Sequence, residues 1–192
     1  MKQAIAVMTL VFFSVASTPG HAFDPVTSVI GKGISTALDV RSKAEVEADV
    51  AIDATLTKRL VEHKGDEFRN IAVLVFARHA VLVGFAATTE VKKKADDLAR
   101  GDKRLRSVKN DIVVGRASGS VAADTLLEKK IDLKLTAAKG VHSVNMRWKV
   151  YGGDVFLTGV AKTAAEADLA LRTVKAADGV KTVHSSLRVG KK

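Results

Sequence analysis

Apolar and polar positions along the chain follow one pattern that occurs twice, at an offset of 75 positions. In the first copy, residues 43–62 have apolar side chains at helical spacing, and residues 71–76 and 80–88 contain apolar runs of strand length. A polar helical pattern covers residues 88–100, and alternating apolar positions close the copy over residues 108–114. The predicted order of elements is helix, strand, strand, helix, strand, and then the same order again.

The two copies align over their full length. Residues 44–115 lie over residues 119–190 without a gap, and 16 of the 72 aligned pairs are identical. The identities are spread along the alignment, with apolar-for-apolar exchanges between them. A match of this length without an insertion indicates a tandem repeat of one αββαβ unit. We therefore expect a first domain over residues 44–115 and a second over residues 119–190.

Short turn and cap signals separate the predicted elements. Gly152-Gly153-Asp154 lies between two strand-length runs, which predicts a β-hairpin there and, by the offset, at Ala77-Arg78-His79. Thr88 and Thr163 stand where a side-chain oxygen can cap the second helix of each copy.

The first 22 residues have the layout of a secretory signal peptide. Lys2 precedes an apolar run over residues 4–16, which is shorter than the roughly 20 residues that span a bilayer, and small residues precede the expected cleavage after Ala22. The chain has no cysteine, which excludes disulfides, thiol catalysis and lipidation at a cysteine. We expect a secreted periplasmic protein that is neither a lipoprotein nor a transmembrane protein. Residues 23–43 are expected to form a loosely helical leader segment.

Basic residues outnumber acidic ones, mainly in the second copy. The formal charge of +10 becomes +9 once Lys2 is removed with the signal. Residues 41–115 hold 15 basic and 12 acidic side chains, whereas residues 116–192 hold 14 and 7. In an exported protein this balance favours contact with anionic lipid, lipopolysaccharide or acidic glycans over nucleic acid. A charge that only keeps the protein soluble is the alternative.

Three short motifs lie at defined places in the repeat. They are the Leu-x-Gly end of the second strand at 82–84 and 157–159, the alanine-rich second helix, and a closing Gly-Val-x-x-Val segment at 179–183. The first copy departs from the last motif, with Arg104 in place of Gly179. With these motifs the chain resembles the BON domain, the bacterial osmotic-shock and nodulation domain.

The resemblance implies an α+β fold of two tandem units, each with two helices on one face of a small three-stranded sheet. It also implies a non-enzymatic protein of the periplasm and outer membrane, associated with osmotic stress, envelope integrity and attachment to phospholipid. The glycines of the Leu-x-Gly motif, Gly84 and Gly159, are expected to serve a positive φ or close packing rather than a ligand.

Basic side chains on the predicted elements are the candidate contact surface for an anionic membrane. Each Lys or Arg near an anionic leaflet contributes about 1 kcal/mol, so a face with several of them can hold a protein reversibly. A solvated helix face is the alternative. The candidate lipid-binding residues are Lys92, Lys93, Lys94 and Arg100 in the first copy, and Lys129, Lys130, Lys134, Arg147 and Lys149 in the second.

A second candidate surface is the sheet face that the helices leave uncovered. Leu82 and Gly84, which recur in both copies, are assigned to the helix-covered face, so their neighbours point the other way. Because so much exposed apolar area is costly in water, we expect the two sheets to pack on each other or on a second molecule. The candidate interface residues are Val81, Val83, Phe85, Phe156 and Val160.

The sequence contains no constellation typical of an enzyme. The histidines share no repeat position and show neither HxxxH nor HxH spacing, and no P-loop or dinucleotide fingerprint occurs. Asp49 and Asp124, which occupy the same position of both copies, are expected to be structural. Trp148 is expected to pack in a core or between the copies, with an interfacial lipid anchor as the alternative.

We therefore expect no catalysis, no metal, no cofactor and no nucleic-acid partner. The predicted function is peripheral binding to anionic phospholipid that supports envelope integrity under osmotic stress. The alternative is a protein-interaction or chaperone-like periplasmic module that contacts envelope proteins through the uncovered sheet face and does not bind lipid.

Overall fold

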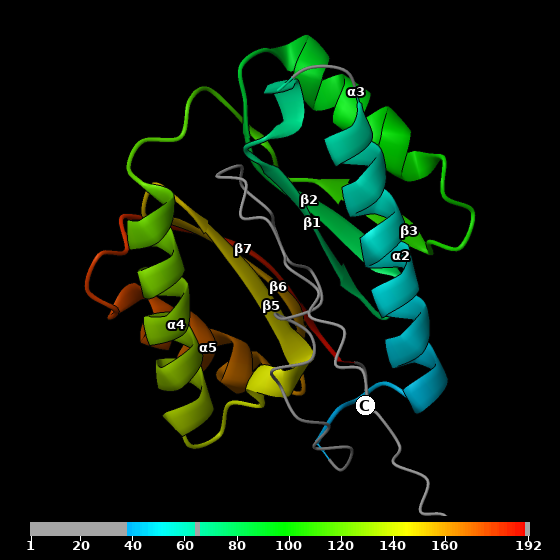
Figure 1. The fold of residues 1–192 in the computed structure, drawn as a ribbon. Helices are drawn as coiled ribbons and strands as arrows, with labels where there is room; N and C mark the ends of the chain where they lie inside the picture. The colour runs from blue at the N-terminus through cyan, green and yellow to red at the C-terminus, as the bar shows by residue number, and fades with distance from the viewer. Residues whose placement is uncertain (1–37, 64–65, 191–192) are drawn as a thin grey trace, which may run out of the picture.

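The computed structural model describes residues 38–63 and 66–190, which form two αββαβ units in succession (Figure 1). The first unit contains α2 (Lys43–Glu62), the 3₁₀ helix η1 (Asp66–Phe68), β1 (Ile71–Phe76), β2 (His79–Ala86), α3 (Thr89–Arg100), β3 (Ser107–Asn110) and β4 (Val113–Val114). The second contains α4 (Val121–Ala137), the 3₁₀ helix η2 (Ser143–Asn145), β5 (Met146–Tyr151), β6 (Asp154–Ala161), α5 (Ala164–Lys175) and β7 (Thr182–Val189). The predicted α+β fold of two tandem units is confirmed. The predicted signal peptide and most of the predicted leader lie outside the described residues.

Each unit builds its sheet in the same way. The hairpin strands β1 and β2 pair antiparallel, and the closing strand pairs parallel with β2; in the second unit β5, β6 and β7 repeat this arrangement. The closing strand of the first unit is interrupted between β3 and β4. There Asn110 Oδ1 accepts a hydrogen bond from Ile112 N at 3.2 Å. A side chain that accepts a hydrogen bond from a nearby backbone amide competes with strand pairing for that amide.

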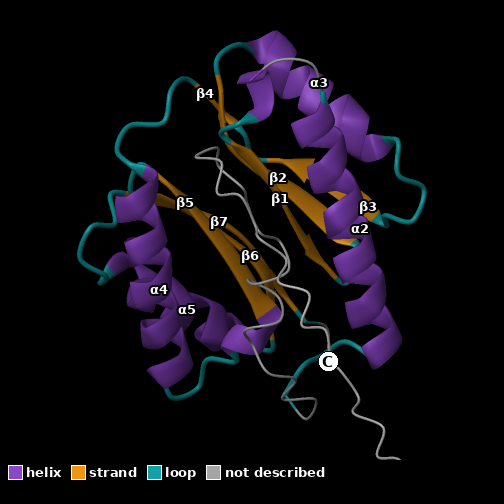
Figure 2. Cartoon of the chain, in the orientation of Figure 1, coloured by secondary structure: helices purple, strands orange, loops and turns teal. Residues whose placement is uncertain are grey.

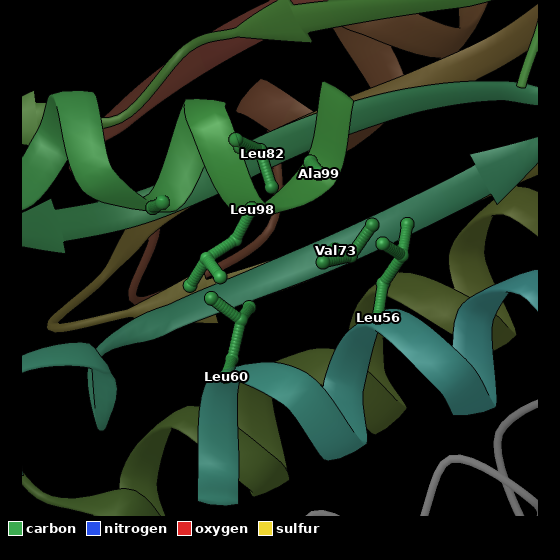
Figure 3. Close-up of a pocket in the computed structure, with 7 residues that line it drawn as sticks. Leu56, Leu60, Val73, Leu82, Leu98 and Ala99 are labelled. Carbon is green, nitrogen blue, oxygen red and sulfur yellow. The ribbon is translucent and has the colours of Figure 1, made fainter. Parts of the chain in front are cut away.

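The helices cover one face of each sheet because their apolar residues recur four positions apart. In the first unit Ile52, Leu56 and Leu60 of α2 are buried against the sheet, with Val73 of β1 and Leu82 of β2. Figure 3 shows side chains from α2, α3 and the sheet converging on this region, where the recess leaves no room for a water molecule. The helix-covered face of the first unit is therefore a filled core and not a ligand pocket.

One aspartate in each unit orders the hairpin turn. The carboxylate of Asp49 accepts the backbone amides of Ala77 and Arg78 at 2.6 and 2.7 Å. Asp124 accepts the amides of the two glycines at the equivalent turn at 2.8 and 3.2 Å. All four turn residues have positive φ angles, so each carboxylate pairs with two N–H groups of a turn that is otherwise hard to form. The recurrence of this aspartate in both copies has a structural reason.

The capping threonines and the Leu-x-Gly glycines also have direct structural roles. The Oγ1 atoms of Thr88 and Thr163 accept hydrogen bonds from the backbone amides of Val91 and Glu166, in the first turns of α3 and α5, at 3.3 and 3.1 Å, as predicted. Gly84 and Gly159 have φ angles of +109° and +128°, and a Cβ atom at either would lie 2.1 Å from a backbone carbonyl oxygen. Both glycines are therefore required sterically by the first hairpin strand.

The two sheets pack back to back, with the helices outside. Figure 2 shows the strands of both units in the middle of the molecule, α2 and α3 on one side, and α4 and α5 on the other. The described end of the leader, residues 38–42, lies against both units and forms a turn and bends instead of the predicted loose helix. Asn145 holds it at Leu38 O and Val40 N, each at 2.9 Å, and Arg41 pairs with Asp49 at 2.9 Å.

Candidate functional site

Most of the basic charge predicted on α3 is neutralised by carboxylates. Three of the four candidate residues there form ion pairs: Lys93 with Asp97 at 2.5 Å, Lys94 with Glu67 at 3.4 Å, and Arg100 with Asp96 at 2.6 Å. Lys92 differs, because its Nζ donates to the backbone carbonyl of Ile112 at 2.6 Å. The face of α3 therefore presents little net charge to a membrane.

Arg147 and Lys149 do not lie on an open basic face either. The guanidinium of Arg147 donates to the carbonyls of Val144 and Met146 at 3.0 and 2.7 Å, and it lies 5.5 Å from the ring centroid of Phe76 in the first unit. Burial lowers the pKa of Arg147 to about 10. The side chain of Lys149 is 20% exposed and pairs with Glu128 at 2.8 Å. Arg147 therefore lies at the boundary between the units, and the charge of Lys149 is balanced within the second unit.

The remaining three lysines share the outer surface of α4 with two exposed leucines. Lys129, Lys130 and Lys134 are exposed, and within residues 38–63 and 66–190 none of them pairs with a carboxylate. Leu126 and Leu133 are 56% and 71% exposed. Positions 126, 129, 130 and 133 follow the spacing of one helix face. We call the five residues Leu126, Lys129, Lys130, Leu133 and Lys134 the α4 strip.

The leucines of the α4 strip were missed by the sequence reasoning although their signal was present. The inward face of α4 is supplied by Leu127, Ile131 and Leu135, which are buried. Leu126 and Leu133 are additional, so α4 has more apolar residues than its core requires. Figure 1 shows α4 on the outside of the second unit, on the side of its sheet that faces away from the first unit. The two leucines thus expose apolar area on a surface that no other described element covers.

The equivalent face of α2 has a different composition. By the repeat offset, Leu126 and Leu133 correspond to Ala51 and Lys58, and Lys58 pairs with Glu62 at 3.6 Å. The combination of leucines with unpaired lysines therefore belongs to the second unit, where the excess of basic residues is also larger.

Three of the five candidate interface residues lie in one buried cluster between the sheets. Val81, Val83 and Phe156 are 6%, 2% and 1% exposed. Phe85 packs against them, with its ring edge-on to Phe156 at 6.1 Å between centroids. Val160 is half-buried and lies outside this cluster. The cluster also contains or contacts residues that the sequence reasoning missed, namely Ala72, Leu74, Val113 and Tyr151.

This packing leaves the uncovered sheet faces internal. A protein-binding module that relies on those faces would have no open surface in this arrangement. Trp148 is also internal, since it packs against the helix-covered core of the second unit and its Nε1 donates to the carbonyl of Glu128 at 3.3 Å. The indole is therefore placed for core packing rather than for lipid contact.

In the part of the chain that the structure describes, no group of three or more His, Asp or Glu side chains converges as a metal site. No described helix has both the length and the apolar composition needed to cross a membrane.

Comparisons with known proteins agree with the repeat. A family model for the BON domain matches residues 48–116 and 123–191. Over 144 residues the chain is 32% identical to osmotically-inducible protein Y of Escherichia coli (strain K12), covering 73% of this chain and 72% of that protein. It is 29% identical over 144 residues to an uncharacterized protein in the gshII 5' region of Anaplasma centrale, covering 73% of this chain and 94% of the other. The 21 kDa hemolysin of Actinobacillus pleuropneumoniae is 28% identical over 119 residues, which cover 61% of each chain. The chain belongs to the BON-domain family.

Proposed function

We propose that this is a non-enzymatic periplasmic protein that binds anionic phospholipid peripherally and supports the envelope under osmotic stress. The α4 strip is the surface that makes the contact. The observation that carries the proposal is that strip itself, in which two exposed leucines lie beside three lysines that have no carboxylate partner among the described residues. The osmotic role is supported by the similarity to osmotically-inducible protein Y.

The energetics require both kinds of side chain. Three lysines near an anionic leaflet contribute about 3 kcal/mol in total, which alone corresponds to binding weaker than millimolar. Inserting a largely exposed leucine into the interface adds roughly 1–2 kcal/mol for each side chain. The sum of roughly 5–7 kcal/mol, before the cost of association, is in the range of reversible attachment. A protein held in this way needs no lipid chain or membrane-spanning helix.

Sedimentation with vesicles tests the proposal directly. We expect the mature protein to sediment with phosphatidylglycerol vesicles at low salt and less at high salt, because salt shortens the Debye length from about 10 to 3 Å between 0.1 and 1 M. It should hardly sediment with phosphatidylcholine vesicles, because their headgroups have no net charge. Lys129→Gln with Lys130→Gln should reduce binding and its salt dependence. Leu126→Ser with Leu133→Ser should reduce binding at every salt concentration.

The matched control is Val61→Ser. Val61 is a 73% exposed apolar residue on α2, in the first unit and outside the α4 strip. This variant should bind vesicles as the parent does. The proposal is wrong if the parent fails to bind anionic vesicles, or if the leucine variant and the Val61 variant bind them equally well.

A further inference from the structure

A polar cleft of about 320 Å³ opens where the closing strands of the two units meet. The first unit lines it with Lys92 of α3 and with the segment 109–112 at the interruption between β3 and β4. The second unit lines it with His184 and Ser185 of β7. Its volume is within the range of small-molecule sites, and both units contribute to its walls.

The charge in this cleft is not balanced. Lys109 and Asp111 neutralise each other at 3.0 Å, and Ser186 Oγ lies within hydrogen-bond distance of both. Lys92 has no carboxylate partner among the described residues. Its ammonium donates to the carbonyl of Ile112, which uses one of three donors. The cleft therefore has one uncompensated positive charge with free N–H groups.

The groups around Lys92 are held in place. Asn110 Nδ2 donates to the backbone carbonyl of Lys92 at 3.1 Å, which ties α3 to the segment on which the ammonium rests. Across the cleft, the ring of His184 stacks on Phe156 at 4.6 Å and 12°, so the ring plane is fixed. Ser185 beside it is exposed and presents a hydroxyl. Cationic and neutral donors thus face the same space from both units.

We propose that this cleft binds a small phosphate-bearing polyol. A phosphate has terminal oxygens for donors on several sides, which suits an ammonium, an imidazole and a hydroxyl that converge from two walls better than a planar carboxylate does. The Asp111 carboxylate on the same wall accepts a hydrogen bond from a ligand hydroxyl. Such a ligand contacts both units at once, so its binding stabilises their docked arrangement. This site is separate from the α4 strip and does not depend on the proposed membrane role.

Titration of the ¹⁵N-labelled mature protein with inorganic phosphate and with glycerol phosphate tests the site by NMR. We expect saturable shifts on both walls, at amides of residues 109–112 and 184–185, with glycerol phosphate binding more tightly. Lys92→Gln should weaken binding by roughly tenfold or more. Lys93→Gln is the matched control, because Lys93 is its neighbour on α3, is paired with Asp97 and does not line the cleft.

A second variant is needed because Lys92→Gln also removes the hydrogen bond to the carbonyl of Ile112 and could change the cleft indirectly. Ser185→Glu adds a negative charge at an exposed position of the cleft and should abolish binding without lowering the thermal midpoint. The inference is overturned if neither phosphate compound nor phosphatidylglycerol vesicles give saturable shifts on both walls, or if the Lys92 and Lys93 variants respond alike.

A parallel titration with phosphatidylglycerol vesicles distinguishes a free ligand from a lipid headgroup. Shifts on both walls with free glycerol phosphate assign the cleft to a soluble metabolite. Shifts that need phosphatidylglycerol vesicles and are lost in Lys92→Gln assign it to a lipid headgroup. The Leu126→Ser with Leu133→Ser variant should still bind free glycerol phosphate, so this result and the vesicle result for the α4 strip can fail independently.

Discussion

At the scale of single residues, the carboxyl of Asp53 makes stability depend on pH. Asp53 of α2 is half-buried, and its carboxylate accepts a hydrogen bond from Thr57 at 3.2 Å. Desolvation raises the pKa of Asp53 to about 6 from an ordinary value of 3.8, although Thr57 and the charge of Arg147 act in the opposite direction. A carboxyl with a raised pKa is destabilising in its charged form.

The sign of the resulting pH dependence follows from linkage. The folded protein binds the Asp53 proton more tightly than the unfolded chain, so this group's contribution is fully present below pH 3.8 and is lost as the pH rises through about 6. Asp53→Asn should therefore raise the free energy of unfolding above pH 6, by about 2 kcal/mol or less, and have little effect below 3.8. Urea unfolding at several pH values measures this. Asp168→Asn on the exposed face of α5 is the control, and an equal pH profile for both variants would contradict the prediction.

The sequence could predict the role of some residues and not of others. Asp49 and Asp124 were predicted to be structural because they recur at the same repeat position, and each orders a hairpin turn. The environment of Asp53 was not predictable, because Arg147 lies far away in the sequence and the repeat offset says nothing about contacts between copies. Three of the candidate lipid-binding residues on α3, Lys93, Lys94 and Arg100, are neutralised by carboxylates that their own charge does not reveal.

At the scale of elements, periodicity and the repeat offset predicted almost every helix and strand. The hairpin at Ala77-Arg78 has no glycine and would not be identified from its own residues, yet its counterpart Gly152-Gly153 indicated it. The interruption between β3 and β4 was not predicted, because Val108, Asn110, Ile112 and Val114 alternate as a continuous strand would. At the interruption the side chain of Asn110 accepts a hydrogen bond from the backbone amide of Ile112.

The two hairpin turns allow a matched experiment. Ala77 has a φ of +52°, a region that costs an ordinary residue about 1–2 kcal/mol and that asparagine tolerates better. Ala77→Asn should therefore raise the free energy of unfolding by up to about 1 kcal/mol. Gly152→Ala should lower it by about 1–3 kcal/mol, since Gly152 has a φ of +64° and a Cβ there would lie 1.8 Å from Ser118 O. Thermal unfolding of both variants checks this, and changes of the same sign would show that turn strain is not the cause.

At the scale of the whole molecule, the apolar residues on the sheet faces that the helices leave uncovered predicted that these faces would be covered. The structure shows that the sheets of the two units cover each other. The leader's position was not predictable. Its contacts with the second unit are made by backbone groups of Leu38 and Val40 with one amide side chain more than 100 positions away, and backbone groups carry no sequence signal. Asn145 aligns with Asn70 in the repeat. The repeat alone cannot show that Asn145 contacts the described part of the leader and that Asn70 does not.

That difference between the two asparagines gives a test of how the leader stabilises the docked units. Asn145 is fully buried, and its amide donates to Leu38 O and accepts from Val40 N, so Asn145→Asp removes the donor and places a carboxylate against a carbonyl. Leaving a buried acceptor unpaired beside a charge costs about 3 kcal/mol. Asn70→Asp, at the half-buried equivalent position, should cost less than about 1 kcal/mol. Limited proteolysis with urea unfolding distinguishes the outcomes: only Asn145→Asp should speed cleavage near residues 38–42. Equal stability losses with unchanged cleavage would mean that the asparagine supports each unit's own fold and that the leader contributes nothing.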